Sequence, residues 1–321
     1  MDREQEEIQF LGVFGIFKES YNIIFSRRKI FTQITLALIL PLSFIYFLHA
    51  HVSILFSKKF NTANYDKPSD LISHEWLYFW LFNVVYVTLS FIYSLLSTAA
   101  VVYTIACIYT GREVSFKKVK SVVPKVWKRL MVTFLCIFVA MFFYLVVSVV
   151  VFLIWAVSVG GIQTVGIAVL AILVILFIVG LLYLTTVWHL ASTISVLEEV
   201  YGFPAMVKSQ KLIKGKLLLA ISVFVIIGLA SGFISQIAFK GLVVEGTSIG
   251  MFSRVVYAII CLLLLSTTIL FGLVIQTVIY FVCKSYHHEN IDKSALSDHL
   301  EVYLLGEYTR LKTEDVQLFH V

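Results

Sequence analysis

Polar side chains inside the most apolar stretches of the sequence are the first candidates for chemistry. Thr185, His189 and Ser192 recur every three or four residues and therefore share one face of a helix. Gln276 lies in a later apolar stretch, eight residues before a lysine, much as His189 lies nine residues before Glu198. Because polar groups in a bilayer are costly and often functional, these residues form a candidate intramembrane polar site. The alternative interpretation, which we favour, is hydrogen bonding between helices.

No other pattern in the sequence is typical of catalysis. Asp and Glu are missing from the apolar stretches, and no Walker loop, nucleophile elbow or His-Glu-x-x-His motif occurs. His287, His288, Glu289 and His299 are spaced too loosely for a metal site. We therefore expect a protein that is not an enzyme and that uses no cofactor and no metal.

Two adjacent carboxylates mark the end of one apolar stretch. Glu198 and Glu199 directly precede a basic segment that contains Lys208 and Lys211. Opposite charges this close in sequence favour ion pairing, and we expect the two glutamates to form a structural clasp with one of these lysines.

Small residues and cysteines complete the candidates. Gly228 and Gly232 are four residues apart, a spacing that lets helix backbones approach closely, so we expect helix packing there. Cys107 and Cys283 lie near the ends of apolar stretches and are candidate sites of palmitoylation.

The composition excludes a soluble enzyme or a nucleic-acid-binding module. Of the 321 residues, 60% are hydrophobic and only 14% are charged, and the mean hydropathy is +0.95. A soluble domain has about 45–50% apolar and about 25% charged residues. The net charge of +6 does not indicate nucleic acid, because the basic residues lie at the ends of the apolar stretches.

The charge-free stretches predict six transmembrane helices, since about 20 apolar residues cross the ~30 Å hydrocarbon core. The predicted spans are about 30–56, 76–110, 130–157, 165–197, 217–239 and 255–283. Pro41 removes one backbone hydrogen bond from the first span and predicts a kink. We expect an all-α integral membrane protein, with a bundle of six transmembrane helices in three hairpins at 30–285. A cytosolic amphipathic segment at 1–29 precedes this domain, and a cytosolic polar tail at 286–321 follows it.

The distribution of positive charge predicts the orientation. Alternate flanks of the spans hold 20 of the 25 Lys and Arg residues, and the other flanks hold 5. The positive-inside rule places the first set in the cytosol, together with both termini. The predicted location is the endomembrane system or the plasma membrane.

Each odd-numbered span follows a basic, amphipathic segment that we expect to lie as a helix at the cytosolic interface. Apolar residues recur at helical spacing in these segments: Phe10, Phe14, Phe17, Tyr21 and Ile24; Phe116, Val119, Val123, Val126 and Leu130; Ala205 and Leu212, with Ser209. Such faces are typical of helices at headgroup level. The basic residues that we expect to contact lipid headgroups are Arg27, Arg28, Lys117, Lys118, Lys125, Lys128, Lys208, Lys211, Lys214 and Lys216.

Two parts of the sequence resemble known families. The segment from Val196 to Lys216 is similar to the E-x-x-G…A-x-x-x-S-x-x-L-x-K-G stretch of membrane domains associated with bacterial glycerophosphodiester phosphodiesterases. Residues 276–287 and 291–300 resemble an uncharacterised plant family of six-helix membrane proteins. The resemblance implies a six-helix membrane fold without the phosphodiesterase activity, because the catalytic domain is absent.

Together, these patterns predict a non-enzymatic membrane organiser or adaptor. Its basic segments would bind the anionic lipids of the cytosolic leaflet, and its tail would recruit a protein partner. A transporter or channel for a small neutral or lipophilic solute is the alternative. The sequence is compatible with a homo-oligomer, and we expect no nucleic acid partner.

Overall fold

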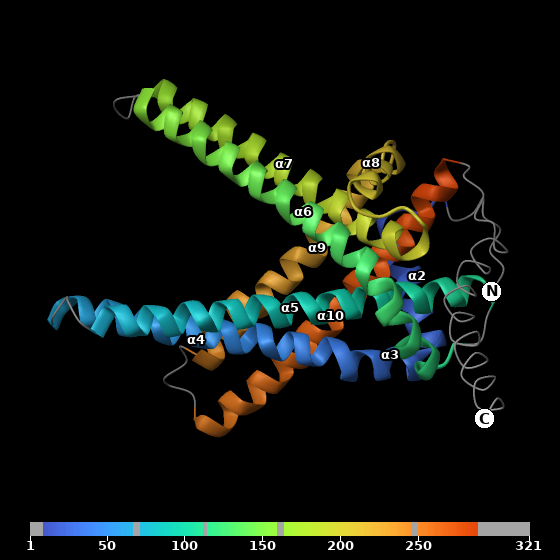
Figure 1. Cartoon of the computed structure of the whole chain (residues 1–321), viewed down its shortest axis with the longest axis horizontal. Helices are drawn as coiled ribbons and strands as arrows, with labels where there is room; N and C mark the ends of the chain where they lie inside the picture. Colours follow the sequence, from blue (N-terminus) through green and yellow to red (C-terminus); the bar gives the residue numbers. More distant parts are fainter. Residues whose placement is uncertain (1–8, 67–70, 112–113, 159–163, 245–249, 288–321) are drawn as a thin grey trace, which may run out of the picture.

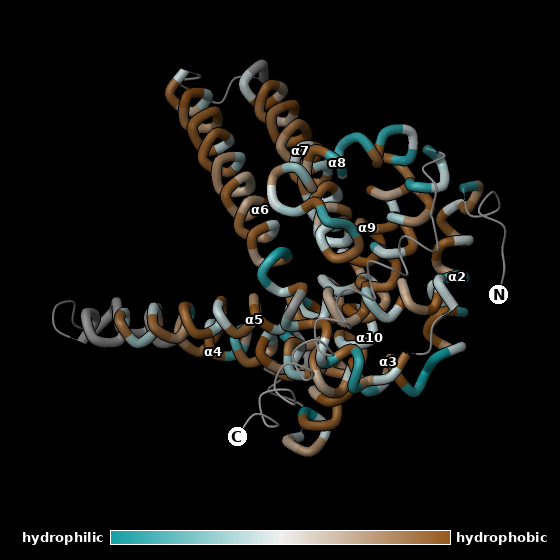
Figure 2. Tube along the Cα trace, turned by 45° about the vertical axis from the view of Figure 1, so that its right-hand side comes forward, coloured by the Kyte–Doolittle hydropathy of each residue, from teal (hydrophilic) through white to brown (hydrophobic). Residues whose placement is uncertain are grey.

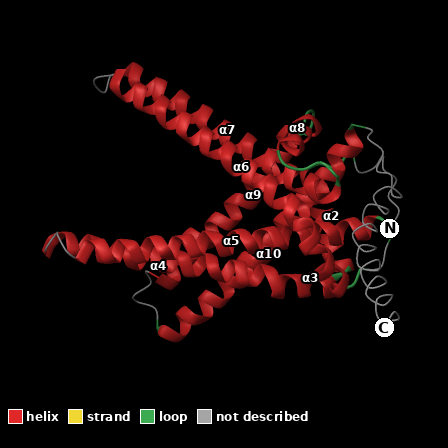
Figure 3. Cartoon of the chain, in the orientation of Figure 1, coloured by secondary structure: helices red, strands yellow, loops and turns green. Residues whose placement is uncertain are grey.

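The computed structural model describes residues 9–66, 71–111, 114–158, 164–244 and 250–287, and every regular element in this part of the chain is helical (Figure 3). The elements are α2 (Val13–Ser26), α3 (Arg28–Ile34), the π-helix η1 (Thr35–Ile39), α4 (Leu40–Asp66), α5 (Leu71–Tyr109), α6 (Phe116–Ser158), α7 (Thr164–Leu197), α8 (Phe203–Leu212), α9 (Leu217–Gly232), the π-helix η2 (Phe233–Val244) and α10 (Met251–Tyr286).

Six helical stretches are long and apolar enough to cross a membrane, as predicted. They are Arg28–Ser57, Trp76–Tyr109, Val126–Ser158, Gly166–Leu197, Leu217–Gly241 and Met251–Tyr286. Their mean hydropathy lies between 1.9 and 3.2, so each can leave water for the hydrocarbon core. The expectation of an all-helical protein with six potential spans is therefore confirmed.

Two pairs of long helices diverge from a common end of the molecule (Figure 1). α4 packs along α5, and α6 packs along α7. α10 is central, since it contacts α2, α4, α5, α7, α9 and η2. At the common end lie α2, α3, α8 and the first turns of α6, and we call this the basic end. Figure 2 shows hydrophilic residues gathered there and hydrophobic residues along the long helices.

The protein core lies toward the basic end. The largest fully buried side chains include Tyr280 and Phe281 of α10, Ile105 of α5 and Ile194 of α7. Away from this end the long helices expose apolar side chains instead, for example Phe138, which is 67% exposed. These exposed surfaces suit contact with lipid chains rather than with water.

Two prolines lie where a helix tolerates a missing N–H. η1 ends two residues before Pro41, and the N–H of Leu40 donates to the carbonyl of Thr35, five residues back. A π turn is a usual way to accommodate a disturbed hydrogen-bond ladder within a helix. Pro204 lies in the first turn of α8, where its missing N–H has no intrahelical partner to lose.

The amphipathic segments differ in part from their predicted form. α2 buries Ile16, Ser20 and Ile23, whereas Phe14 of the predicted apolar face is 91% exposed. The sequence placed the aromatic face at the headgroup level and did not predict that the residues between the aromatics pack on the bundle. The second segment is no separate helix, because it continues directly into the span as one helix of 43 residues.

Gly228 and Gly232, where helix packing is predicted, have no close neighbour from another helix in the described part of the chain. A Cβ added at either glycine would meet no described atom within 4 Å. The close approach lies instead at Gly180 of α7, where an added Cβ would overlap the side chain of Tyr144 on α6. The Tyr144 hydroxyl donates to the carbonyl of Phe177 at 2.8 Å and ties α6 to α7.

Candidate functional site

The four candidate polar residues do not all meet. His189 of α7 donates from Nδ1 to Oε1 of Gln276 on α10, at 3.0 Å. The hydroxyl of Thr185 donates to the carbonyl of Leu181, and that of Ser192 donates to the carbonyl of His189. Thr185 and Ser192 therefore satisfy their hydroxyls within α7, and of these four residues only the histidine and the glutamine form a hydrogen bond between helices.

A second histidine–amide pair joins two other helices at the same distance. His49 of α4 donates from Nε2 to Oδ1 of Asn83 on α5, at 3.0 Å, and its ring stacks on Tyr86. Sequence reasoning missed this pair, since nothing in the sequence aligns these two positions across neighbouring helices. Two pairs of this kind in one bundle are typical of interhelical hydrogen bonds that replace unsatisfied polar groups in hydrocarbon.

A cavity of about 490 Å³ lies between α7, α9 and α10 beside His189. Its lining is mostly apolar, and its polar members include Thr185, Thr186 and Ser231. Each of these three hydroxyls donates to a carbonyl of its own helix. The cavity suits an apolar molecule or an acyl chain, and its described lining contains no carboxylate that could pair with the histidine for acid–base chemistry.

The predicted clasp forms through Glu198 and not through Glu199. Oε2 of Glu198 lies 2.6 Å from Nζ of Lys208 on α8. Oε1 accepts a hydrogen bond of 2.7 Å from the Tyr280 hydroxyl and lies 3.4 Å from Nζ of Lys284, both on α10. Glu199 is exposed. One carboxylate thus joins the end of α7 to α8 and to α10.

The surroundings of Glu198 favour its ionised form. Burial raises the pKa of this carboxyl, but the hydrogen bonds from Lys208 and Tyr280, together with the charges of Lys284 and Lys208, outweigh burial and lower the pKa below the ordinary glutamate value. The sequence did not predict the two partners on α10. Their i, i+4 spacing puts them on one face of that helix, which was the available signal.

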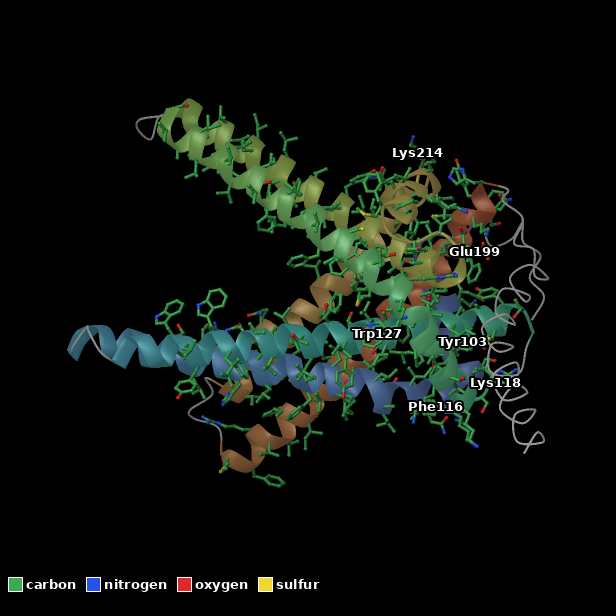
Figure 4. The ribbon with its side chains drawn as sticks, viewed as in Figure 1. Tyr103, Phe116, Lys118, Trp127, Glu199 and Lys214 are labelled. Atoms are coloured by element: carbon green, nitrogen blue, oxygen red, sulfur yellow. The ribbon has the colours of Figure 1, made fainter. Side chains whose placement is uncertain are left out.

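The predicted headgroup-contacting residues collect at the basic end, and Figure 4 labels Lys118 and Lys214 there. The exposed members of the set are Arg27, Arg28, Lys117, Lys118, Lys128, Lys211 and Lys214. Lys208 and Lys216 are partly buried, and Lys216 lies over the ring of Tyr286 at 5.0 Å from its centroid. The side chain of Lys125 lies outside the described residues. Arg27, Arg28 and Lys117 meet around one cavity, a convergence that the sequence alone did not show.

The two cysteines considered for palmitoylation are buried. Cys107 is 3% exposed and Cys283 is fully buried. Acylation needs an accessible thiolate, so the described structure argues against modification at either position.

This fold defines the class of the protein: a helical protein with the six apolar helices of a multipass membrane protein. The chain belongs to the family described as Domain of unknown function (DUF8558), whose family model matches residues 1–321. No curated protein and no solved structure matches the chain. The family match gives no link to the membrane domain of glycerophosphodiester phosphodiesterases or to plants.

Proposed function

We propose that this chain is a non-enzymatic membrane organiser or adaptor, located in the endomembrane system or the plasma membrane. The basic side chains at its basic end bind anionic lipids of the cytosolic leaflet, and its tail recruits protein partners. The observation that carries the proposal is the exposure of basic side chains from α2, α3, α6 and α8 at one end of the bundle. These residues are far apart in the sequence, so it is the fold that brings them to the same end of the bundle.

The expected energy of this contact is substantial. A Lys or Arg next to an anionic membrane surface contributes about 1 kcal/mol. The exposed aromatic side chains of α2 add a second support, because Phe14, Tyr21 and Phe25 are each at least 49% exposed. Aromatic residues beside basic ones are typical of helices that lie at headgroup level.

Lipid co-purification tests the lipid part of the proposal. We would extract the full chain in native lipid particles and measure the ratio of anionic to neutral lipid by mass spectrometry. The variant Lys118→Gln with Lys214→Gln should retain clearly less anionic lipid than wild type. The matched control Lys240→Gln with Arg254→Gln removes the same charge beyond the opposite end of α9 and should keep the wild-type ratio. Equal ratios in both variants would contradict the proposal.

The adaptor part rests on the tail. Proximity labelling in the native cell should recover a partner set with wild type that is lost when residues 288–321 are deleted. The deletion should leave the anionic lipid ratio unchanged, because the lipid contacts lie in the bundle. An unchanged partner set would remove the adaptor role and leave the lipid role intact.

Transport of a small solute is the alternative function, and it would depend on the cavity beside His189. A transporter of a polar solute needs a continuous polar path, whereas this cavity is mostly apolar, three of its hydroxyls bond to their own helices, and a lipophilic solute would compete there with acyl chains. Its geometry therefore lends transport no specific support.

A further inference from the structure

A second cavity of about 590 Å³ lies at the basic end, between the start of α3 and the start of α6. It lies within the roughly 300–1,000 Å³ that is common for ligand pockets. Arg27, Arg28, Lys29 and Lys117 line it, together with Ser115 and Gln33. Four cations from two elements, about 90 positions apart in the sequence, thus face one space.

The charge in this cavity is uncompensated within the described part of the chain. No carboxylate lines the cavity, and none of its four basic side chains forms an ion pair with a described residue. Like charges around one space repel one another, so an anion that enters relieves a cost as well as forming new contacts.

The available donors suit phosphate oxygens. Arg27 and Arg28 carry planar guanidinium groups that bind phosphate through two parallel hydrogen bonds, and Lys29 and Lys117 supply point charges. The first N–H groups of α6, which begins at Phe116, have no intrahelical acceptors and add partial positive charge beside Ser115.

The position of the cavity suits a lipid headgroup. Arg28 is the first residue of a potential span, so the cavity lies at the boundary between hydrocarbon and water. Ile30 and Phe116 also line it and can contact the glycerol and the first methylenes of a lipid. A phosphodiester carries one negative charge, whereas a phosphate monoester carries about −1.5 to −2 at pH 7. Four converging cations therefore favour an anion with more than one monoester.

We infer that Arg27, Arg28, Lys29 and Lys117 form a binding pocket for a headgroup that carries phosphate monoesters, of the kind found on phosphorylated inositol lipids. The inference rests on the proposed contact between the basic end and anionic lipid, and it names one site and one ligand chemistry within that contact. The same chemistry exists in soluble inositol phosphates, so the test must separate the two sources.

The experiment uses the full chain in phosphatidylcholine nanodiscs. Binding is measured for three probes: labelled phosphatidylinositol bisphosphate, labelled phosphatidylserine and soluble inositol trisphosphate. Wild type should bind the bisphosphate lipid roughly tenfold or more tightly than phosphatidylserine. Similar affinity for inositol trisphosphate would identify the free phosphate compound as a sufficient ligand, and much weaker affinity would identify the lipid; both support the pocket.

Matched variants locate the site. Arg28→Gln with Lys117→Gln should weaken binding of the bisphosphate lipid roughly tenfold or more. Lys18→Gln with Lys120→Gln removes the same charge from exposed side chains outside the lining and should change binding less than about threefold. Arg28→Lys keeps the charge but loses the planar fork, and it should give an intermediate loss, which guards against a folding defect in the double variant.

Two results would overturn the inference. If wild type binds phosphatidylserine and the bisphosphate lipid equally, and both double variants weaken binding alike, the charge acts as a diffuse surface and there is no pocket. The proposed lipid contact would survive that result. If no anionic probe binds better than phosphatidylcholine, the pocket and the proposed lipid contact fail together.

Discussion

Polar contacts from two neighbouring helices converge on Glu198. Its carboxylate meets two lysines and one phenol, from α8 and α10, and its own backbone ends α7. With side-chain exposures of 13% for Glu198 and 18% for Lys284, water screens this cluster only in part. Removing the carboxylate would leave Lys284 and the Tyr280 hydroxyl without this acceptor.

We expect Glu198→Gln to lower the free energy of unfolding by about 1–3 kcal/mol, because the amide keeps one accepting oxygen but loses the negative charge that faces Lys208 and Lys284. Unfolding of the purified chain in mixed micelles by increasing SDS measures this. Glu199→Gln is the matched control, because the Glu199 side chain is exposed and its replacement should not measurably change the free energy of unfolding. A Glu198→Gln protein as stable as the control would show that the cluster contributes nothing.

The lowered pKa of Glu198 sets the direction of the pH dependence. A carboxylate with a lower pKa in the folded state stabilises the protein fully above the ordinary glutamate pKa of about 4.3. That contribution is lost as the pH falls through the folded-state pKa. The stability difference between wild type and Glu198→Gln should therefore be constant from about pH 8 to pH 6 and should shrink toward about pH 3. A difference that grew on acidification would contradict the assignment.

His189 is expected to act as an interhelical contact rather than as a ligand-binding residue. His189→Leu should cost about 0.6 kcal/mol, the mean of such membrane hydrogen bonds. His49→Leu, at the corresponding pair on α4 and α5, should cost a similar amount. In cells that lack the wild-type protein, each histidine variant should lose function only to the extent that its abundance falls. Loss of rescue at normal abundance in both His189→Leu and His189→Gln would instead assign a ligand to the cavity.

For single residues, the sequence predicts the level of a side chain along its helix better than it predicts which side chain of another helix it contacts. His189 and Gln276 lie eight or nine residues before a charged helix end, so a constant rise per residue predicts that they are level. Whether two level side chains touch depends on how each helix is rotated about its axis. Packing of the whole bundle decides that rotation, which is why the Glu198–Tyr280 contact and the His49–Asn83 pair were not predicted.

At the scale of the elements, the contact between α6 and α7 can be tested with one pair of glycines. Gly180→Ala places a methyl group against Tyr144 and should displace the hydroxyl that bonds to Phe177, so this variant should be about 1 kcal/mol less stable than Gly228→Ala. Gly228→Ala meets open space and replaces a poor helix former, so the stability should be unchanged or rise by up to about 1 kcal/mol. SDS unfolding compares the two, and equal effects would contradict the packing described for α6 and α7.

Hydropathy predicts the spans because transfer to hydrocarbon is additive along the chain, and all six potential spans are present. Helix packing faces are harder to predict at a membrane edge, where both faces of a helix can be apolar. α2 illustrates this: Phe14 and Tyr21 share a face by spacing, but Ile16 and Ile23 are the buried residues. The spacing of Gly228 and Gly232 was equally ambiguous, because small residues permit close packing without requiring it.

For the whole molecule, the 20 to 5 division of basic residues predicts an orientation that is directly testable. An inserted glycosylation acceptor site in the 58–75 segment should be modified, because this segment is expected on the lumenal or outer side. The same acceptor in the 112–129 segment should not be modified. The opposite pattern would reverse the orientation and would place the basic end away from the cytosol.

The divergence of the α4–α5 pair from the α6–α7 pair has a mechanical consequence (Figure 1). Near the basic end, protein side chains fill the space between the helices, but farther out α6 exposes Phe138, Phe142 and Leu153. In a bilayer the acyl chains take the place of a core there. The side-chain packing that joins the two pairs therefore lies near the basic end, and farther out we expect acyl chains to press on the helices instead. We therefore expect a change in acyl-chain length or saturation to change the angle between the α4–α5 and α6–α7 pairs while the packing of the basic end stays the same.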